Sequence, residues 1–235
     1  MLEVLAERGL FRAGAVLIGT LAYAQYGNLL GIGLDRTAVR TADVDLLHDS
    51  ALSLAIDPTA RKQDLSAALV EANPEFLAVP PLDPKQASSL FKVRGRDLRV
   101  DFLTPAGRGR QGVRRIRGLG VAAQALPHLG YLLDDVVRAV VLYDAGVLVN
   151  LPDPARFLLH KIWTAGARPA TEALKSRKDL AQAGQLLEVL SADRPGDLSR
   201  AWKELPRSMV RRVVATVRSS PGLEALRDLV PGRPG

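Results

Sequence analysis

Two carboxylates alternate with an apolar residue in the segment "TADVDLL", residues 41–47. Successive side chains of a β-strand point to opposite faces, so Asp43 and Asp45 lie on one face and Val44 on the other. A chain with this pattern must place the strand so that one face stays polar while the other is buried. Because like charges on one face repel each other, the two carboxylates also need compensation.

A third acid, Asp101, lies within the apolar run "LRVDFLT", residues 98–104. Burying a carboxylate costs free energy unless an opposite charge or hydrogen bonds compensate it. Divalent metal can compensate several carboxylates together, and hard cations such as Mg²⁺ prefer oxygen ligands. Two such ions can clamp a phosphoryl group that undergoes displacement. The sequence therefore predicts a metal-assisted phosphoryl-transfer site at Asp43, Asp45 and Asp101.

A glycine and a threonine join a predicted buried strand, residues 15–19, to a predicted helix, residues 20–31. Gly19 has no side chain and lets a phosphate approach the backbone, while the first helical turn offers N–H donors. Thr20 is expected to cap the helix and to add a hydroxyl. Each of these motifs is common by itself, and their order along the chain makes them informative.

That order resembles the nucleotidyltransferase superfamily, which has the DNA polymerase β-like fold. Its members have Gly-Ser or Gly-Thr before a helix, Asp-x-Asp on the next strand and a third acid in a later apolar strand. The chain is similar in particular to an uncharacterised bacterial nucleotidyltransferase-like family, and more distantly to AbiEii-type toxin nucleotidyltransferases. The resemblance covers roughly residues 10–205, and its segments are "GTLAYAQYGNLLG", "TADVDLL", "VDFLTP", "PDPARFLLHK" and "RKDLAQAGQLLEVL".

The resemblance implies a magnesium-dependent transferase. Such an enzyme would move a nucleoside monophosphate from an NTP, such as ATP, to an acceptor hydroxyl and release pyrophosphate. Asp43, Asp45 and Asp101 would be the catalytic residues and would bind two Mg²⁺ ions, with Mn²⁺ as a substitute. Gly19 and Thr20 would hold the β- and γ-phosphates.

The resemblance also implies a role for the C-terminal half of the chain. Lys161 would hold the triphosphate, and the neighbouring residues Lys178 and Asp179 would complete the nucleotide-binding site. A lysine and a Lys-Asp pair are also ordinary features of solvated helices, so the residues themselves leave both interpretations open.

The segment "AGRGRQGVRRIRG", residues 106–118, contains five arginines and no acid. It follows the strand of Asp101 and is predicted to be a loop or flexible hairpin near the active site. Binding the phosphates of an acceptor and simple solvation explain it equally well. Residues 106–235 as a whole carry 21 Lys or Arg against 12 Asp or Glu, which fits a polyanionic partner and a solvated helical surface equally well. The candidate acceptor-binding residues are Arg108, Arg110, Arg114, Arg115 and Arg117.

The hydrophobic pattern changes near residue 152. Before that point, short apolar runs between turns predict strands, including hairpins over residues 89–104 and 139–152. An amphipathic helix is expected over residues 58–73. After Pro154 the pattern is helical, and the expected helices span residues 154–165, 171–191, 197–204, 207–219 and 221–229.

We therefore predict an α+β protein with two domains. Residues 1–152 would form the catalytic domain, a nucleotidyltransferase-fold mixed sheet with flanking helices. Residues 153–235 would form an all-helical substrate or recognition domain.

An uncharged stretch at residues 13–34 has the length of a membrane span but not its composition. It contains five glycines as well as Gln25 and Asn28. We therefore predict that it is retained as a buried strand and helix in a cytoplasmic protein without membrane association. Cleavage after Ala24 would instead indicate a periplasmic protein. The absence of cysteine excludes disulfides and Cys-based zinc sites.

The expected partners are an NTP and an RNA or protein acceptor. An alternative function is a non-catalytic nucleotide- or RNA-binding module that keeps the same fold, for example within a toxin–antitoxin or phage-defence system. The presence of all three acids favours the enzyme. An arginine that fills the acid cluster would favour the module.

Overall fold

The computed structural model describes residues 1–49, 64–81, 87–107, 112–116 and 119–229. The chain divides into two compact units. The first comprises Met1–Gly33 and Val39–Leu151, and the second comprises Leu34–Ala38 and Pro152–Gly235. The short segment Leu34–Ala38 thus belongs with the C-terminal unit, although it lies between elements of the first unit in the sequence.

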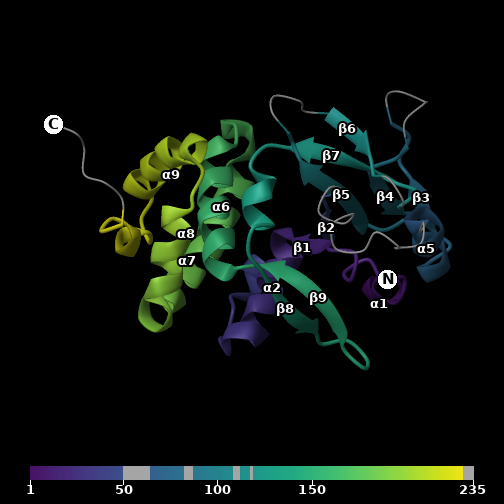
Figure 1. The fold of residues 1–235 in the computed structure, drawn as a ribbon, viewed down its shortest axis with the longest axis horizontal. Coiled ribbons are helices and arrows are strands. Elements are labelled where there is room, and N and C mark those ends of the chain that lie inside the picture. Colours follow the sequence, from purple (N-terminus) through teal and green to yellow (C-terminus); the bar gives the residue numbers. More distant parts are fainter. Residues whose placement is uncertain (50–63, 82–86, 108–111, 117–118, 230–235) are drawn as a thin grey trace. The chain divides into compact units, whose positions relative to one another are not determined.

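A seven-stranded mixed sheet is the framework of the first unit (Figure 1). Its strands follow the order β1-β2-β5-β4-β3, and β7 pairs with the second half of β5 and with β6. The pairs β2–β5 and β5–β7 are parallel, whereas the other pairs are antiparallel. The predicted mixed sheet is therefore confirmed. The strands are β1 Val16–Ile18, β2 Asp43–Leu47, β3 Phe76–Ala78, β4 Leu90–Val93, β5 Arg99–Pro105, β6 Gly112–Arg115 and β7 Ala122–Leu126.

One face of β2 and β5 lies in the core. Val44 and Leu46 on β2 and Val100 and Phe102 on β5 are almost fully buried. The ring of Phe102 meets that of Phe91 edge to face, with the two centroids 5.8 Å apart. Each buried side chain of this size contributes about 1.5–3 kcal/mol to stability. A slip of one residue would move the acids into this core, so burial fixes the register.

The opposite face of the sheet is apolar at one end. Val16 and Ile18 on β1 and Leu47 on β2 pack with Leu129 and Leu132 of the short helical turn η1, Leu129–Leu132. This face therefore changes from polar to apolar along β2. The change confines the half-buried carboxylates of β2 to the N-terminal part of the strand.

Three helices flank this sheet. α1 (Leu2–Glu7) packs against α5 (Leu65–Ala72), and α2 (Gly19–Leu30) packs against β1 and β2. The Asp64 carboxylate accepts a hydrogen bond from the Ala67 N–H at 3.1 Å and caps α5, a contact worth about 1 kcal/mol. The start of the predicted helix over residues 58–73 lies outside the described residues.

α2 begins directly where β1 ends. Ile18 is its N-cap residue, so the prediction that Thr20 caps the helix is wrong. Because α2 starts at Gly19, Thr20 lies within the first turn and not before it.

A separate two-stranded sheet, β8 (Val136–Val141) with β9 (Val147–Pro152), completes the first unit. The predicted hairpin over residues 139–152 is confirmed, and its first strand begins three residues earlier. One face of this hairpin packs against α2.

After Pro152, the described residues of the second unit form helices and the turns between them, as predicted (Figure 1). Asp153 caps its first helix and accepts hydrogen bonds from the Ala155 and Arg156 N–H groups at 2.9 and 3.0 Å. That helix, α6, packs against α7, α8 and α9. Gln182 on α7 donates to the Ala38 carbonyl at 2.8 Å and attaches the short helix α3 to this unit. The helices are α3 Arg36–Val39, α6 Pro154–Ala167, α7 Ala173–Asp193, α8 Pro195–Lys203 and α9 Arg207–Ser219.

The predicted helix over residues 221–229 is wrong. Only a short turn, η3 (Glu224–Leu226), forms there. Gly222 has a φ of +84°, which breaks the helical path after Pro221. Nowhere in the described ranges is there a helix with both the length and the apolar character needed to cross a bilayer.

Candidate active site

The three predicted catalytic acids lie on one face of the sheet. In the parallel pair β2–β5, Asp45 is the register partner of Asp101, and Asp43 is the register partner of Arg99. Register partners point to the same side, and alternation along β2 places Asp43 with Asp45. All three carboxylates are half-buried on this face (the acid face), while the residues between them are in the core. The two strands lie side by side in Figure 1.

Gly19 is in direct contact with this face. It has a φ of +69°, and a Cβ at this position would lie 2.0 Å from Oδ2 of Asp45. The pairing of Ile18 with Asp45 in the antiparallel β1–β2 ladder causes this closeness. The start of α2, with Gly19 and Thr20, therefore meets the carboxylate of Asp45.

Replacing Gly19 with alanine is expected to destabilise the first unit by about 2 kcal/mol, because the new Cβ meets both backbone strain and the Asp45 carboxylate. Gly31 is a matched control, since it has the same φ of +69°, and a Cβ added there would meet no atom of the described residues within 4 Å. Gly31→Ala should cost about 1 kcal/mol, the strain alone. Urea unfolding of both variants measures the difference. If both variants lose the same free energy of unfolding, the contact between the added Cβ and the Asp45 carboxylate has no cost of its own.

Two cations share the acid face, and sequence analysis missed both of them. The Arg99 guanidinium donates a hydrogen bond to Asp43 Oδ1 and forms an ion pair with it. Lys92 on β4 is the register partner of Arg99 in the antiparallel pair β4–β5. Alternation along β5 places Arg99 on the same face as Asp101, just as alternation along β2 places Asp43 with Asp45. The sequence therefore already indicated that Arg99 shares a face with an acid.

The electrostatics of the acid face follow from these contacts. Burial raises the pKa of Asp101 above its usual range, Arg99 and Lys92 act to lower it, and Asp43 adds to the rise. The hydrogen bond to Asp43 raises the pKa of Arg99, and the charges of Asp101 and Asp45 act in the same direction. Asp101 is therefore a stronger base than an exposed aspartate.

The donor set on the acid face can be compared with the needs of a metal ion. Within the described residues, no group of three or more His, Asp or Glu side chains is arranged to hold a metal. The register partners Asp45 and Asp101 nevertheless offer oxygen donors from adjacent strands. Mg²⁺ usually keeps several waters and binds proteins through one or two carboxylates together with substrate phosphates. A pair of carboxylates therefore fits a Mg²⁺ ion that arrives with a nucleotide.

The predicted acceptor-binding arginines lie only partly within the described residues. Arg114 and Arg115 are on β6, where they pair with Ala123 and Ala122 of β7. Arg114 is half-buried and Arg115 is exposed. Part of the predicted loop is thus a strand that extends the sheet. Arg108, Arg110 and Arg117 lie outside the described residues.

The predicted nucleotide-binding residues of the second unit form an ionic cluster. Nζ of Lys161 on α6 donates to Asp179 Oδ1 on α7 at 2.7 Å, and Nε of Arg168 donates to Asp179 Oδ2 at 2.8 Å. The side chains of Asp179 and Lys161 are only 6% and 12% exposed. Lys178 is half-buried on α7, next to Asp179. Sequence analysis missed Arg168, and a role of this cluster in nucleotide binding remains a prediction.

Comparison with known proteins gives the chain a family context. A family model described as nucleotidyltransferase matches residues 1–207. One solved structure, that of an antigenic nucleotidyltransferase-like protein from Paracoccidioides brasiliensis, is 18% identical and covers 85% of this chain and 90% of its own, with a TM-score of 0.37. No curated protein matches the chain.

Proposed function

The chain belongs to the nucleotidyltransferase family, and from this premise we propose that it transfers a nucleoside monophosphate from an NTP to an acceptor hydroxyl and releases pyrophosphate. The observation that supports the proposal most is the position of Gly19 against Asp45, which is itself the register partner of Asp101. A helix start and two half-buried carboxylates meet on one sheet face, which supports a site where the helix start would receive phosphates.

Each residue of the acid face has a part in this proposal. Asp45 and Asp101 hold the divalent cation, and Gly19 and Thr20 present the start of α2 to the β- and γ-phosphates. Bound there, Mg²⁺ would supply positive charge against the triphosphate and the leaving pyrophosphate. Asp43 holds Arg99, whose guanidinium adds further positive charge beside the phosphates.

Asp101 also accepts a proton in the proposed reaction. The acceptor hydroxyl gives its proton to the Asp101 carboxylate, and the oxygen forms a bond to the α-phosphorus. The bond from that phosphorus to the β-phosphate oxygen breaks, and pyrophosphate leaves with the electron pair. Burial raises the pKa of Asp101 in the absence of a cation, and a cation bound beside it would act in the opposite direction.

One observation favours a second candidate function. The ion pair between Arg99 and Asp43 places an arginine within the acid face, as a non-catalytic nucleotide- or RNA-binding module would have it. In such a module, Arg99 would take the place of the metal as the compensating charge.

A single assay separates the two functions. The purified chain is incubated with Mg²⁺ and NTPs labelled at the α-phosphate, together with total RNA and total protein. The enzyme releases pyrophosphate and leaves the labelled monophosphate attached to one of the acceptor pools. The module binds the labelled nucleotide or RNA and transfers nothing. Release of inorganic phosphate without transfer would contradict both proposals.

The arginines of β6 test whether the acceptor is RNA. If Arg114 and Arg115 contact phosphates, replacing both with alanine should weaken RNA binding and reduce the log–log salt slope by about one unit for each lost contact. A filter-binding titration at several salt concentrations measures both quantities. The matched control replaces Arg94 and Arg96, two exposed arginines of the β4–β5 turn. An unchanged slope in the β6 variant would favour a protein or small-molecule acceptor.

A further inference from the structure

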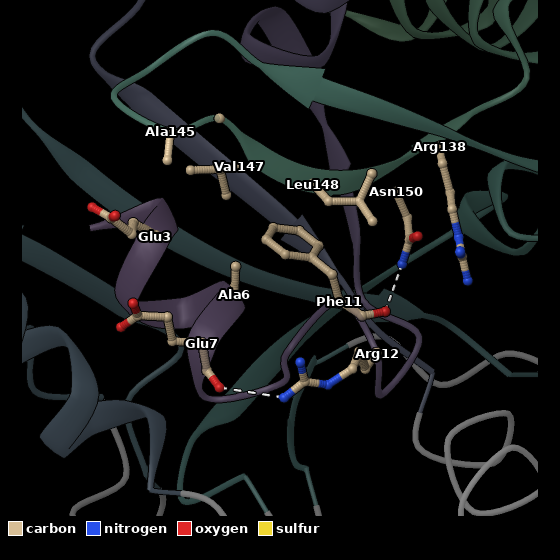
Figure 2. A pocket seen from close by; sticks show the side chains of 11 residues that line it. Glu3, Ala6, Glu7, Phe11, Arg12, Arg138, Ala145, Val147, Leu148 and Asn150 are labelled. Carbon is tan, nitrogen blue, oxygen red and sulfur yellow. Dashed lines mark hydrogen bonds between the residues drawn. The ribbon is translucent and has the colours of Figure 1, made fainter.

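A cavity of about 530 Å³ lies in the first unit, between α1 with the loop that follows it and the β8–β9 hairpin (Figure 2). Its centre is apolar, with the ring of Phe11 facing Val147 and Leu148. Asn150 donates to the Phe11 and Ala15 carbonyls at 2.7 and 2.8 Å and holds one wall in place. None of these side chains belongs to the acid face.

Charged side chains of both signs line this cavity. Figure 2 shows Glu3 and Glu7 at one end and Arg138 at the other, with Phe11 between them. Arg12 lies below Phe11 and donates to the Glu7 carbonyl at 3.4 Å. Glu3, Glu7 and Arg138 form no ion pair within the described part of the chain. The cavity therefore has two carboxylates at one end, with the Arg12 guanidinium reaching toward them, and the Arg138 guanidinium at the other end.

The hairpin beside the cavity is unusually apolar on its exposed side. The described residues include nine exposed large apolar side chains, and five of them are on this hairpin. The two at its turn, Leu142 and Tyr143, are 75% and 66% exposed. Such a concentration indicates an interaction surface, because exposed apolar residues without a role are scattered singly over a protein surface. The five residues are Val136, Val140, Leu142, Tyr143 and Leu148.

We propose that this face, formed by α1, the cavity and the exposed side of the β8–β9 hairpin, is a two-fold interface with a second copy of the chain. In a two-fold interface the same patch occurs on both sides and must complement itself. A two-fold axis across the middle of this face places the acidic end of each copy opposite the basic end of the other. The apolar centres then meet, and the charges at both ends gain partners.

The hairpin turn matches the cavity of the second copy in the same arrangement. The turn residue Asp144 precedes Ala145, which lies at the acidic end in Figure 2. The two-fold axis therefore carries Leu142, Tyr143 and Asp144 toward the basic end of the other copy.

Other occupants complement this face less completely. A small molecule that fills about 530 Å³ would leave the hairpin turn exposed. A partner with charges of one sign would satisfy one end and oppose the other. A second copy carries both signs and the apolar turn, so it satisfies every part of the face at once.

Charge reversal tests the proposal by a mixing experiment. Sedimentation equilibrium of the full chain should show a dimer at about 10 μM that weakens with added salt. Arg138→Glu and Glu7→Arg should each raise the dimer dissociation constant by at least about tenfold, because each homodimer then places like charges opposite each other. A mixture of the two variants should regain the wild-type affinity, since opposite charges face each other at both ends of the mixed dimer.

The control variant is Arg94→Glu, which makes the same charge change on an exposed residue of the β4–β5 turn and should leave the dimer intact. A chain that stays monomeric at about 100 μM would overturn the proposal and assign the face to a different partner. A dimer that tolerates both reversals, or a mixture that fails to recover, would also overturn it. Because the readout is mass and not catalysis, this result is independent of the proposed function.

Discussion

Asp101→Asn is expected to lower the turnover number of the proposed transfer by about 100- to 1,000-fold. The amide keeps the size of the carboxylate and loses its charge. It can neither bind the cation as a carboxylate does nor accept the proton of the acceptor hydroxyl. Initial rates of pyrophosphate release at saturating NTP measure the loss.

The same variant is expected to be at least as stable as the wild type at neutral pH. Burial raises the pKa of Asp101, so the native state holds this proton to a higher pH than the unfolded chain. The stability that Asp101 contributes is therefore present at acid pH and is lost as the pH rises through the native pKa. An asparagine avoids that loss, so the difference in midpoint temperature between variant and wild type should shrink as the pH falls.

Asp97→Asn is the control for both measurements. Asp97 is an exposed acid in the turn between β4 and β5, two residues before Arg99. Its replacement should change neither the rate nor the midpoint temperature appreciably. An Asp101→Asn variant that keeps full activity would remove Asp101 from the catalytic site. If the variant is inactive because it unfolds, its midpoint temperature will lie far below that of the wild type, contrary to the expectation above.

Asp179→Asn is expected to destabilise the helical unit by about 3–5 kcal/mol. Asp179 accepts hydrogen bonds from Lys161 and Arg168 through its two separate oxygens, and its side chain is only 6% exposed. Removing its charge leaves two cations close together with little access to water. Their mutual repulsion and lost solvation are the physical origin of the large effect. Urea unfolding, followed by far-ultraviolet circular dichroism, measures it.

Glu172→Gln provides the comparison within the same cluster. Glu172 also pairs with Arg168, through Nη1 at 2.6 Å, but its side chain is 38% exposed. Water compensates the loss of a partner at an exposed site, so this change should cost less than about 1 kcal/mol. If both variants lose the same small free energy of unfolding, water screens Asp179 as well, and the cluster is not a buried ionic centre.

Features that depend only on neighbouring residues could be predicted from the sequence. The alternation of Asp43 and Asp45 with apolar residues predicted that both share a face, because side-chain direction in a strand depends only on position. The change to helical periodicity after Pro154 predicted an all-helical C-terminal unit, since each helix closes its own hydrogen bonds. The resemblance in motif order predicted the nucleotidyltransferase family, to which the chain belongs.

Pairing between distant strands decided the rest of the candidate site. The register of β2 with β5 places Asp101 beside Asp45 and Arg99 beside Asp43, which makes the acid face partly basic. The register joins residues that are 56 positions apart and depends on which apolar residues bury best, so no local pattern predicts it.

Contacts between elements that are distant in the sequence also decided where a small residue is needed and which charged side chains come together. Glycine suits position 19 because its φ is +69° and because an added Cβ would lie 2.0 Å from Oδ2 of Asp45, a closeness that the β1–β2 ladder creates. Arg168 became part of the Asp179 cluster because α6 and α7 pack together. The charged ends of the α1–hairpin cavity come from residues 3–12 and 138, which the fold brings to one surface. Strand alternation and helical periodicity are properties of neighbouring residues and can be read from the sequence, whereas burial, ion pairing and cavities arise from elements that meet only in the folded chain.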